Sequence, residues 1–133
     1  MNKKKVAFIC VHNSCRSQMA EGFGHHLGND VFESYSAGSE EYPQVKPLAV
    51  EVMAEIGIDV SKQYPKLVSD IPQDLDYVIT MGCSATCPII PGAHIEDWGL
   101  DDPSGKGIEE FRKTRDLIEE KTKELVERIK ASA

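Results

Sequence analysis

A short apolar run near the N-terminus stops abruptly at a cysteine, and this junction constrains the fold more than any other stretch. Residues Val6–Ile9 are hydrophobic and predict a buried β-strand, whereas the polar residues after Cys10 predict a loop. A helix is expected from Arg16 to His26. A loop of about five residues that closes onto a helix N-terminus turns backbone N–H groups inward, which makes a site for an anion.

Two side chains give this loop its chemistry. The field at the helix N-terminus favours the thiolate of Cys10, which is therefore a candidate nucleophile. Arg16 carries a planar fork that suits two oxygens of a tetrahedral oxyanion. Arginine at a helix N-terminus opposes the helix dipole, so its presence indicates an anion to pair with. The alternative, a buried cysteine without a chemical role, fits the polar loop poorly.

The rest of the chain alternates strands with helices. Further strands are predicted over residues 31–37, 77–81 and 94–97, and helices over residues 47–56 and 108–131, with a possible short helix within 59–76. This alternation predicts an α/β fold: a single-domain three-layer sandwich with a four-stranded parallel sheet and helices on both faces. Ligands of such sheets bind at the carboxyl ends of the strands, where Cys10 is expected.

Size and charge restrict the class of protein. The 133 residues fit one domain spanning 1–133, and the net charge of −7 disfavours nucleic acid or an anionic membrane as partners. No run approaches the roughly 18 apolar residues of a membrane span, and no signal-peptide core follows Met1. We therefore expect a cytoplasmic monomer. Its four cysteines then indicate catalytic, redox or metal roles rather than a disulfide framework.

The stretch from Cys10 to Gly22 resembles the anion loop shared by low-molecular-weight protein tyrosine phosphatases and thioredoxin-coupled arsenate reductases. The resemblance continues to the final helix and implies the low-molecular-weight phosphatase fold. It implies that one continuous segment surrounds the oxyanion. The substrate-binding residues expected on this basis are Val11, His12, Asn13, Ser14, Cys15, Arg16 and Ser17.

An acidic residue after the fourth strand completes the implied machinery. By resemblance, Asp102 is the general acid that protonates the leaving oxygen. Pro103 restricts Asp102 to extended geometry, which would aim its carboxyl group in a defined direction. Without the resemblance, an acidic turn is an equally good interpretation of these residues.

The resemblance also implies a scaffold beneath the loop. In some arsenate reductases the residues corresponding to Asn13, Glu21 and Ser36 support a bound potassium ion. Lys66 stands where those proteins have an acidic ligand. We therefore expect no metal here, with the lysine ammonium in the cation's place, and no cofactor.

Cys83 and Cys87 distinguish a reductase from a phosphatase. By resemblance, Cys10 forms an adduct with arsenate, and Cys83 then attacks Cys10 to give a Cys10–Cys83 disulfide and arsenite. Cys87 next forms the final Cys83–Cys87 disulfide, which thioredoxin would reduce. The spacer of three residues is shorter than in the best-known reductases, but an i, i+4 pair can still form a disulfide.

The predicted function is thus arsenate reduction, in the service of arsenical resistance and detoxification, with phosphate or sulfate as substrate mimics. Two alternatives remain open: a phosphatase-like hydrolase in which Cys83 and Cys87 are regulatory, and a non-catalytic module that senses oxyanions or redox state. A zinc site is less well supported because no second closely spaced ligand pair is present. Cys15 is expected to pack under the loop rather than to form a protective bridge with Cys10.

Overall fold

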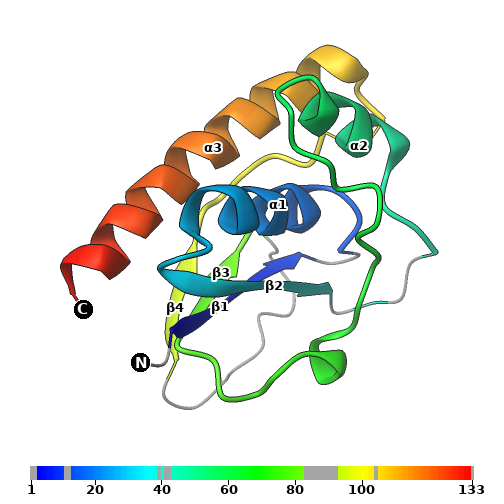
Figure 1. The fold of residues 1–133 in the computed structure, drawn as a ribbon. Coiled ribbons are helices and arrows are strands. Elements are labelled where there is room, and N and C mark those ends of the chain that lie inside the picture. Colours follow the sequence, from blue (N-terminus) through cyan, green and yellow to red (C-terminus); the bar gives the residue numbers. More distant parts are fainter. Residues whose placement is uncertain are drawn as a thin grey trace.

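The computed structural model describes residues 3–10, 13–38, 40, 43–82, 93–103 and 105–132. Strands and helices alternate in the first part of the described chain, and a 3₁₀ helix, two strands and a long helix follow (Figure 1). The elements are β1 (Lys4–Cys10), α1 (Arg16–Gly28), β2 (Phe32–Gly38), α2 (Pro47–Ala54), the 3₁₀ helix η1 (Val68–Asp70), β3 (Tyr77–Thr80), β4 (His94–Asp97) and α3 (Ile108–Ala131). The predicted α/β fold class is confirmed.

The four strands form one parallel sheet in the order β2-β1-β3-β4. Strand β1 lies inside the sheet, with Cys10 opposite Gly38 of β2 and Ile9 opposite Thr80 of β3. Because all strands run in the same direction, their carboxyl ends meet at one edge. The residues that follow β1, β3 and β4 therefore converge beside Cys10.

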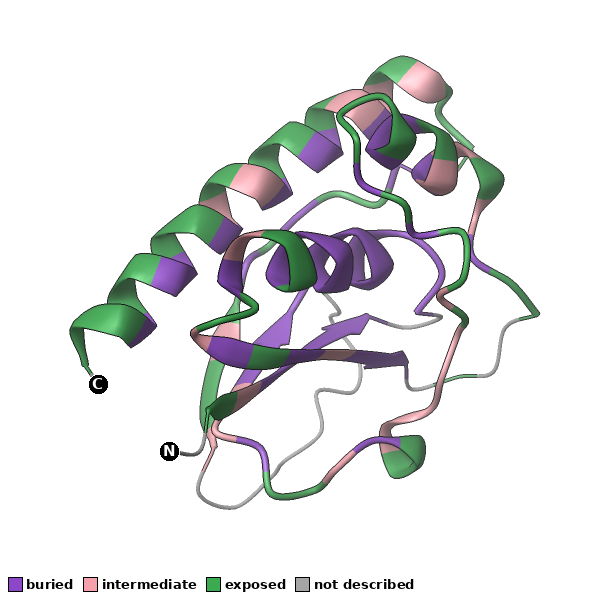
Figure 2. Cartoon of the chain, in the orientation of Figure 1, coloured by how far each residue is buried: buried purple, intermediate pink, exposed green. Residues whose placement is uncertain are grey.

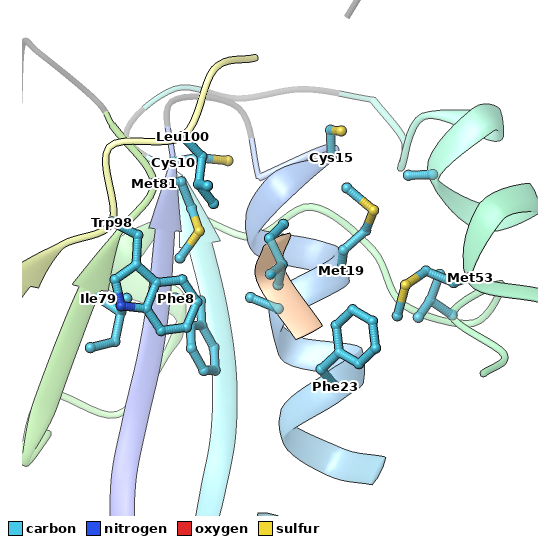
Figure 3. Close-up of a cluster of buried hydrophobic side chains, with 14 of the residues drawn as sticks. Phe8, Cys10, Cys15, Met19, Phe23, Met53, Ile79, Met81, Trp98 and Leu100 are labelled. Carbon is cyan, nitrogen blue, oxygen red and sulfur yellow. The ribbon is translucent and has the colours of Figure 1, made fainter. Parts of the chain in front are cut away.

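Three helices cover one face of the sheet (Figure 1). Helix α1 lies against β1 and β2 and also packs on α3, so it forms the middle of this layer. Phe8, Met19, Phe23 and Ile118 are fully buried there, and the rings of Phe8 and Trp98 lie 5.7 Å apart between centroids (Figure 3). This is the larger of the two clusters of buried apolar side chains.

The second face carries a smaller cluster, formed by Ala7, Ile9 and Val78 of the sheet with Ile71 and Leu75. Within the described ranges, the helix on this side is the single 3₁₀ turn η1, which is the short helix expected within 59–76 (Figure 1). Among the described residues, three helices thus cover the first face and one short turn lies on the second.

Element boundaries follow local chemistry. Helix α3 has the predicted extent, and its buried residues form one stripe along an otherwise exposed helix (Figure 2). Helix α2 begins with Pro47 in its first turn and ends at Ala54, two residues before the predicted end, because the chain turns toward Gly57 at φ +83°. No helix in the described part of the chain is long and apolar enough to cross a membrane.

Candidate active site

Cys10 is the last residue of β1 and is almost completely buried, with 4% of its surface exposed. Its Sγ lies 2.9 Å from the Oγ of Ser17, which belongs to the first turn of α1. The end of β1 thus places the Cys10 sulfur at the N-terminus of α1, as predicted from the sequence. The partial positive charge at that terminus favours an anion at this point.

The loop between strand and helix is held by Asn13. This residue adopts φ 54°, a left-handed conformation that asparagine tolerates better than other side chains with a Cβ. Its Nδ2 donates to Ser17 Oγ at 2.7 Å, and its Oδ1 accepts from the backbone N–H of Lys66 at 2.9 Å. Ser14 and Cys15 are buried beside it, whereas the predicted site residues Val11 and His12 lie outside the described residues.

Arg16 connects three segments that follow three different strands. One guanidinium nitrogen, Nη1, donates to the carbonyl oxygens of Met81 at 2.5 Å and Leu100 at 2.7 Å. The other terminal nitrogen, Nη2, lies 4.0 Å from Oδ2 of Asp102. Because the side chain is only 10% exposed, these contacts hold the guanidinium plane in a fixed position.

Asp102 lies at the open side of this arrangement. Its side chain is 52% exposed, whereas that of Arg16 is nearly buried. It follows β4 and precedes Pro103, and a proline disfavours helical geometry in the residue before it. A half-exposed carboxyl group beside a buried guanidinium can exchange protons with solvent and still face an anion held by Arg16.

Cys15 differs chemically from Cys10 although both are buried. It precedes α1 and packs in the larger apolar cluster (Figure 3). Burial raises the pKa of the Cys15 thiol far above its ordinary range, and the nearby charges of Asp102 and Cys10 act in the same direction. Cys15 is therefore a protonated packing residue at neutral pH.

Glu21 and Lys66 form a buried charge cluster behind the loop. Glu21 Oε1 accepts a hydrogen bond from Ser36 and lies 3.4 Å from Lys66 Nζ, while its Oε2 lies 3.1 Å from His25 Nε2. Burial opposes ionisation of Glu21, but the hydrogen bonds from His25 and Ser36 and the charge of Lys66 outweigh it and lower the pKa. In the described ranges no group of three or more histidine, cysteine or acidic side chains is arranged to hold a metal ion.

The end of β3 is fixed directly before the remaining predicted site residues. Met81 N–H donates to Ile9 O at 3.0 Å, and Gly82 N–H donates to Asp97 Oδ1 at 2.8 Å. Gly82 has φ +94°, and a Cβ there would lie 2.8 Å from the carbonyl oxygen of Leu100, so only glycine fits. Cys83 and Cys87 themselves lie outside the described residues.

Comparison with known proteins matches the chain over nearly its whole length. Residues 5–133 match the family described as low molecular weight phosphotyrosine protein phosphatase. The chain belongs to this family. Arsenate reductase 1 of Staphylococcus haemolyticus is 44% identical over 133 residues, which cover 97% of this chain and 99% of that protein.

Solved structures of arsenate reductases share the fold of this chain. An arsenate reductase in the phosphate-binding state superposes with a TM-score of 0.86 at 40% identity, covering 95% of this chain and 98% of that one. The thioredoxin-dependent arsenate reductase of Corynebacterium glutamicum gives a TM-score of 0.83 at 34% identity, covering 99% of this chain and 64% of that one. The resemblance to arsenate reductases of the phosphatase family, predicted from the loop, is confirmed.

Sequence reasoning missed two polar residues outside the loop that support it, Gln18 of α1 and Gln63. Gln18 is fully buried, and its Nε2 donates to the carbonyl oxygen of Asn13 at 2.9 Å and to that of Tyr64 at 2.9 Å. Gln63 in turn donates to Gln18. A polar side chain in the first turn of a helix gives no sign of burial, so the only signal in the sequence is that Gln18 lies within the stretch from Cys10 to Gly22.

Proposed function

We propose that this chain is a cytoplasmic, monomeric, single-domain enzyme that reduces arsenate to arsenite. Cys10 is the nucleophile, Cys83 and Cys87 are relay thiols, and thioredoxin is the reductant. The observation that carries the proposal is the position of the Cys10 sulfur, which lies 2.9 Å from Ser17 Oγ at a helix N-terminus that also holds the fixed guanidinium of Arg16. The names of the relatives supply the choice of arsenate over phosphate.

Because the protein has a net charge of −7, it can bind the arsenate oxyanion only at a local site of positive charge. The loop amides and the N-terminus of α1 supply partial charges, and Arg16 supplies a full one. Nη1 of Arg16 is already held by Met81 and Leu100, which leaves Nη2 and Nε for the oxyanion. An anchored guanidinium loses little freedom when substrate binds, which favours binding.

The first chemical step forms a sulfur–arsenic bond. The thiolate of Cys10 attacks arsenic, one As–O bond breaks, and Asp102 donates a proton so that this oxygen leaves as water. Arsenic stays pentavalent, and Asp102 is left as a carboxylate. The 4.0 Å separation between Asp102 Oδ2 and Arg16 Nη2 supports this role for Asp102.

The second step moves two electrons to arsenic. The thiolate of Cys83 attacks Cys10 Sγ, the sulfur–arsenic bond breaks, and arsenite leaves with the bonding pair as a Cys10–Cys83 disulfide forms. Strand register supports the reach of this step, because Met81 continues the pairing beside Cys10 at the usual strand spacing of about 4.8 Å. Cys83 is two residues further on, so covalent geometry keeps its Cα within about 7.6 Å of the Cα of Met81.

The third step returns Cys10 to its starting state. Cys87 attacks Cys83, the Cys10 thiolate leaves, and a Cys83–Cys87 disulfide carries the oxidation. Thioredoxin then supplies two electrons as a dithiol. The thioredoxin-dependent reductase among the solved structures supports this choice of reductant.

The proposal is tested by coupling arsenate reduction to NADPH oxidation through thioredoxin and its reductase. Cys10→Ser, Cys83→Ser and Cys87→Ser are each expected to abolish continuous turnover. Hydrolysis of an aryl phosphate, measured in parallel, is the internal control, because Cys83→Ser and Cys87→Ser should retain it and Cys10→Ser should not. Full arsenate turnover by Cys83→Ser would refute the thiol relay.

A second candidate function is phosphate ester hydrolysis. Cys10, Arg16 and Asp102 are sufficient for that reaction, and the family is described as a phosphatase family. Efficient aryl phosphate hydrolysis without arsenate reduction would favour this candidate. Absence of both activities in a folded protein would favour a binding module that senses oxyanions or redox state.

A further inference from the structure

We propose that Gln18 and Gln63 are positioning residues that orient a directional chain of hydrogen bonds ending at the Cys10 sulfur. The chain begins at Gln63, which donates to Gln18; Gln18 donates to Asn13, and Asn13 donates to Ser17. It ends where Ser17 Oγ lies 2.9 Å from Cys10 Sγ. The inference rests on the proposed function only in taking the Cys10 thiolate as the reactive group. It concerns two residues that have no place in the mechanism above.

The direction of the chain is set first at Asn13. A backbone N–H can only donate, so the Asn13 amide atom that lies 2.9 Å from Lys66 N must be the oxygen Oδ1. The Nδ2 group therefore faces Ser17 Oγ at 2.7 Å and donates to it. The orientation of this amide thus follows from the backbone of a segment more than fifty residues away.

The direction is set a second time at Gln18. Backbone carbonyl oxygens can only accept, and the Gln18 amide atom 2.9 Å from both Asn13 O and Tyr64 O must be the nitrogen Nε2. The same Nε2 lies 3.0 Å from Asn13 Oδ1. The opposite amide orientation would place an oxygen against three acceptors in a buried site, which is strongly unfavourable.

Gln63 completes the orientation of Gln18. Its Nε2 donates to Gln18 Oε1 at 2.7 Å and to Gln18 O at 3.0 Å. The Gln18 amide is therefore held from both ends, its oxygen by Gln63 and its nitrogen by the carbonyls of Asn13 and Tyr64. Gln63 is partly exposed, so the chain starts near the surface and ends at a buried sulfur.

The consequence lies in the hydroxyl group of Ser17. Because Ser17 Oγ accepts from Asn13, its own hydrogen is available for Cys10 Sγ at 2.9 Å. A hydrogen bond donated to the sulfur stabilises the negatively charged thiolate more than the neutral thiol. Asn13, Ser17 and Gln18 are all 0% exposed, and in such surroundings aligned hydrogen bonds polarise and strengthen one another.

The test measures how readily Cys10 is alkylated by iodoacetamide across a range of pH, with the modified cysteine identified by peptide mass spectrometry. Gln18→Met and Gln63→Met keep side-chain length and remove the amide. Each is expected to shift the alkylation profile of Cys10 to higher pH. We expect a rate at pH 6.5 that is lower by about fivefold for Gln18→Met and about twofold for Gln63→Met, as for loss of one or two buried hydrogen bonds.

Gln73→Met is the matched control. Gln73 donates to Val68 O and Ile71 O at 2.8 Å, so it holds a turn in the same way but does not contact the loop. It should leave the profile of Cys10 unchanged. Gln63→Met keeps the test decisive if the buried substitution Gln18→Met fails to fold.

A double substitution shows whether the glutamine amides act on Cys10 through Ser17 or by a general loss of order in the loop. If the amides act through Ser17, adding Gln63→Met to Ser17→Ala should cause no further shift. An unchanged profile in folded Gln63→Met, or an equal shift with and without Ser17, would overturn the proposal. Because alkylation needs neither arsenate nor a reductant, failure of the proposed reductase activity would be seen separately.

Discussion

At the scale of single residues, the guanidinium of Arg16 has both a structural role and a role in the anion site. Nη1 joins the segments after β3 and β4 through the carbonyls of Met81 and Leu100, and Nη2 faces Asp102 across the site. A planar group can do both because its donors point in fixed, different directions. The residue is therefore part of the fold and of the anion site together.

Arg16→Lys tests this dual role while keeping the charge. A lysine ammonium cannot bridge both carbonyls and still present a two-pronged donor to an oxyanion. We expect kcat/KM for arsenate to fall by about a hundredfold or more, as for loss of a fixed donor at a reacting centre. The thermal midpoint of unfolding should fall as well. A variant with kcat/KM within threefold of the wild type would contradict the assignment.

Lys66 places a positive charge beside the Glu21 carboxylate. Its backbone N–H holds Asn13, and its ammonium lies 3.4 Å from Glu21 Oε1. Lys66→Asp keeps the backbone contact but faces Glu21 with a second carboxylate, which is unfavourable without a cation. We therefore expect the thermal midpoint of Lys66→Asp to rise with potassium concentration.

The wild type supplies the comparison for Lys66→Asp, since its own ammonium should make the midpoint insensitive to potassium. Sodium at the same ionic strength separates a specific effect from charge screening. Equal responses of the two proteins to potassium would show that Lys66 does not act as a cation substitute.

The sequence predicted those site residues whose role is local. Cys10, Arg16 and Ser17 lie within one strand-loop-helix junction, so their approach follows from the local fold. Gln63 could not be predicted, because its role exists only when the chain brings it to Gln18 from 45 residues away. Its partner Gln18 looks like an ordinary polar residue in the first turn of a helix.

At the scale of elements, the end of β3 shows how backbone contacts set the start of the Cys83 segment. Gly82 N–H donates to the side-chain carboxylate of Asp97, the last residue of β4, and Gly82 packs against the Gly99–Leu100 backbone, so the end of β3 is joined to β4 and to the segment after it. Asp97 also accepts from Thr80 Oγ1 at 2.8 Å. Burial opposes ionisation of Asp97, but these hydrogen bonds prevail and lower the pKa of its carboxyl group.

Gly82→Ala and Gly57→Ala form a matched pair for this element. Both glycines have positive φ, +94° and +83°, but a Cβ at position 57 meets nothing within 4 Å, whereas one at position 82 meets Leu100 O. Gly57→Ala should therefore report only the cost of the left-handed backbone, about 1 kcal/mol. Gly82→Ala should lower the free energy of unfolding by about 1 to 2 kcal/mol more.

Urea unfolding of the two variants measures this difference, and the coupled assay adds a functional test. Arsenate reduction by Gly82→Ala should fall more than its aryl phosphate hydrolysis, because only the reduction uses the segment after Gly82. Equal unfolding energies for the two variants would show that the close approach to Leu100 relaxes freely.

For the architecture, too, the sequence predicted the features that depend on local patterns and not those that depend on tertiary contacts. The alternation of strands and helices gave the parallel sheet, and the apolar stripe of residues 108–131 gave α3. The helix on the second face is shorter than a periodic pattern can reveal, since η1 spans three residues. Its position depends on Ile71 and Leu75 reaching the far side of β1, which is a tertiary contact.

At the scale of the whole molecule, one ion pair ties the edge of the sheet to the long helix. Arg128 of α3 donates to Glu96 of β4 at 2.8 and 2.9 Å, and Trp98 Nε1 donates to the same carboxylate at 2.7 Å. The hydrogen bonds from Arg128, followed by that from Trp98, outweigh burial and lower the pKa of Glu96 to about 2. The free carboxyl group of an unfolded chain titrates near 4.5.

This difference predicts how stability depends on pH. Because the folded state binds the Glu96 proton more weakly than the unfolded state, the ion pair stabilises the fold fully above pH 4.5. The contribution is lost as the pH falls from 4.5 toward 2. Glu96→Gln should therefore lower the free energy of unfolding by about 1 to 2 kcal/mol at pH 7, after allowance for the half-exposed arginine.

Urea unfolding of the wild type and Glu96→Gln between pH 7 and pH 2 checks this prediction. The gap between the two proteins should stay constant down to about pH 5 and then close, because a protonated Glu96 resembles glutamine in charge. Glu127→Gln, which removes one exposed carboxylate of α3, controls for the change in net charge. A gap of constant size over the whole range would mean that Glu96 contributes through packing and neutral hydrogen bonds, and that charge does not join β4 to α3.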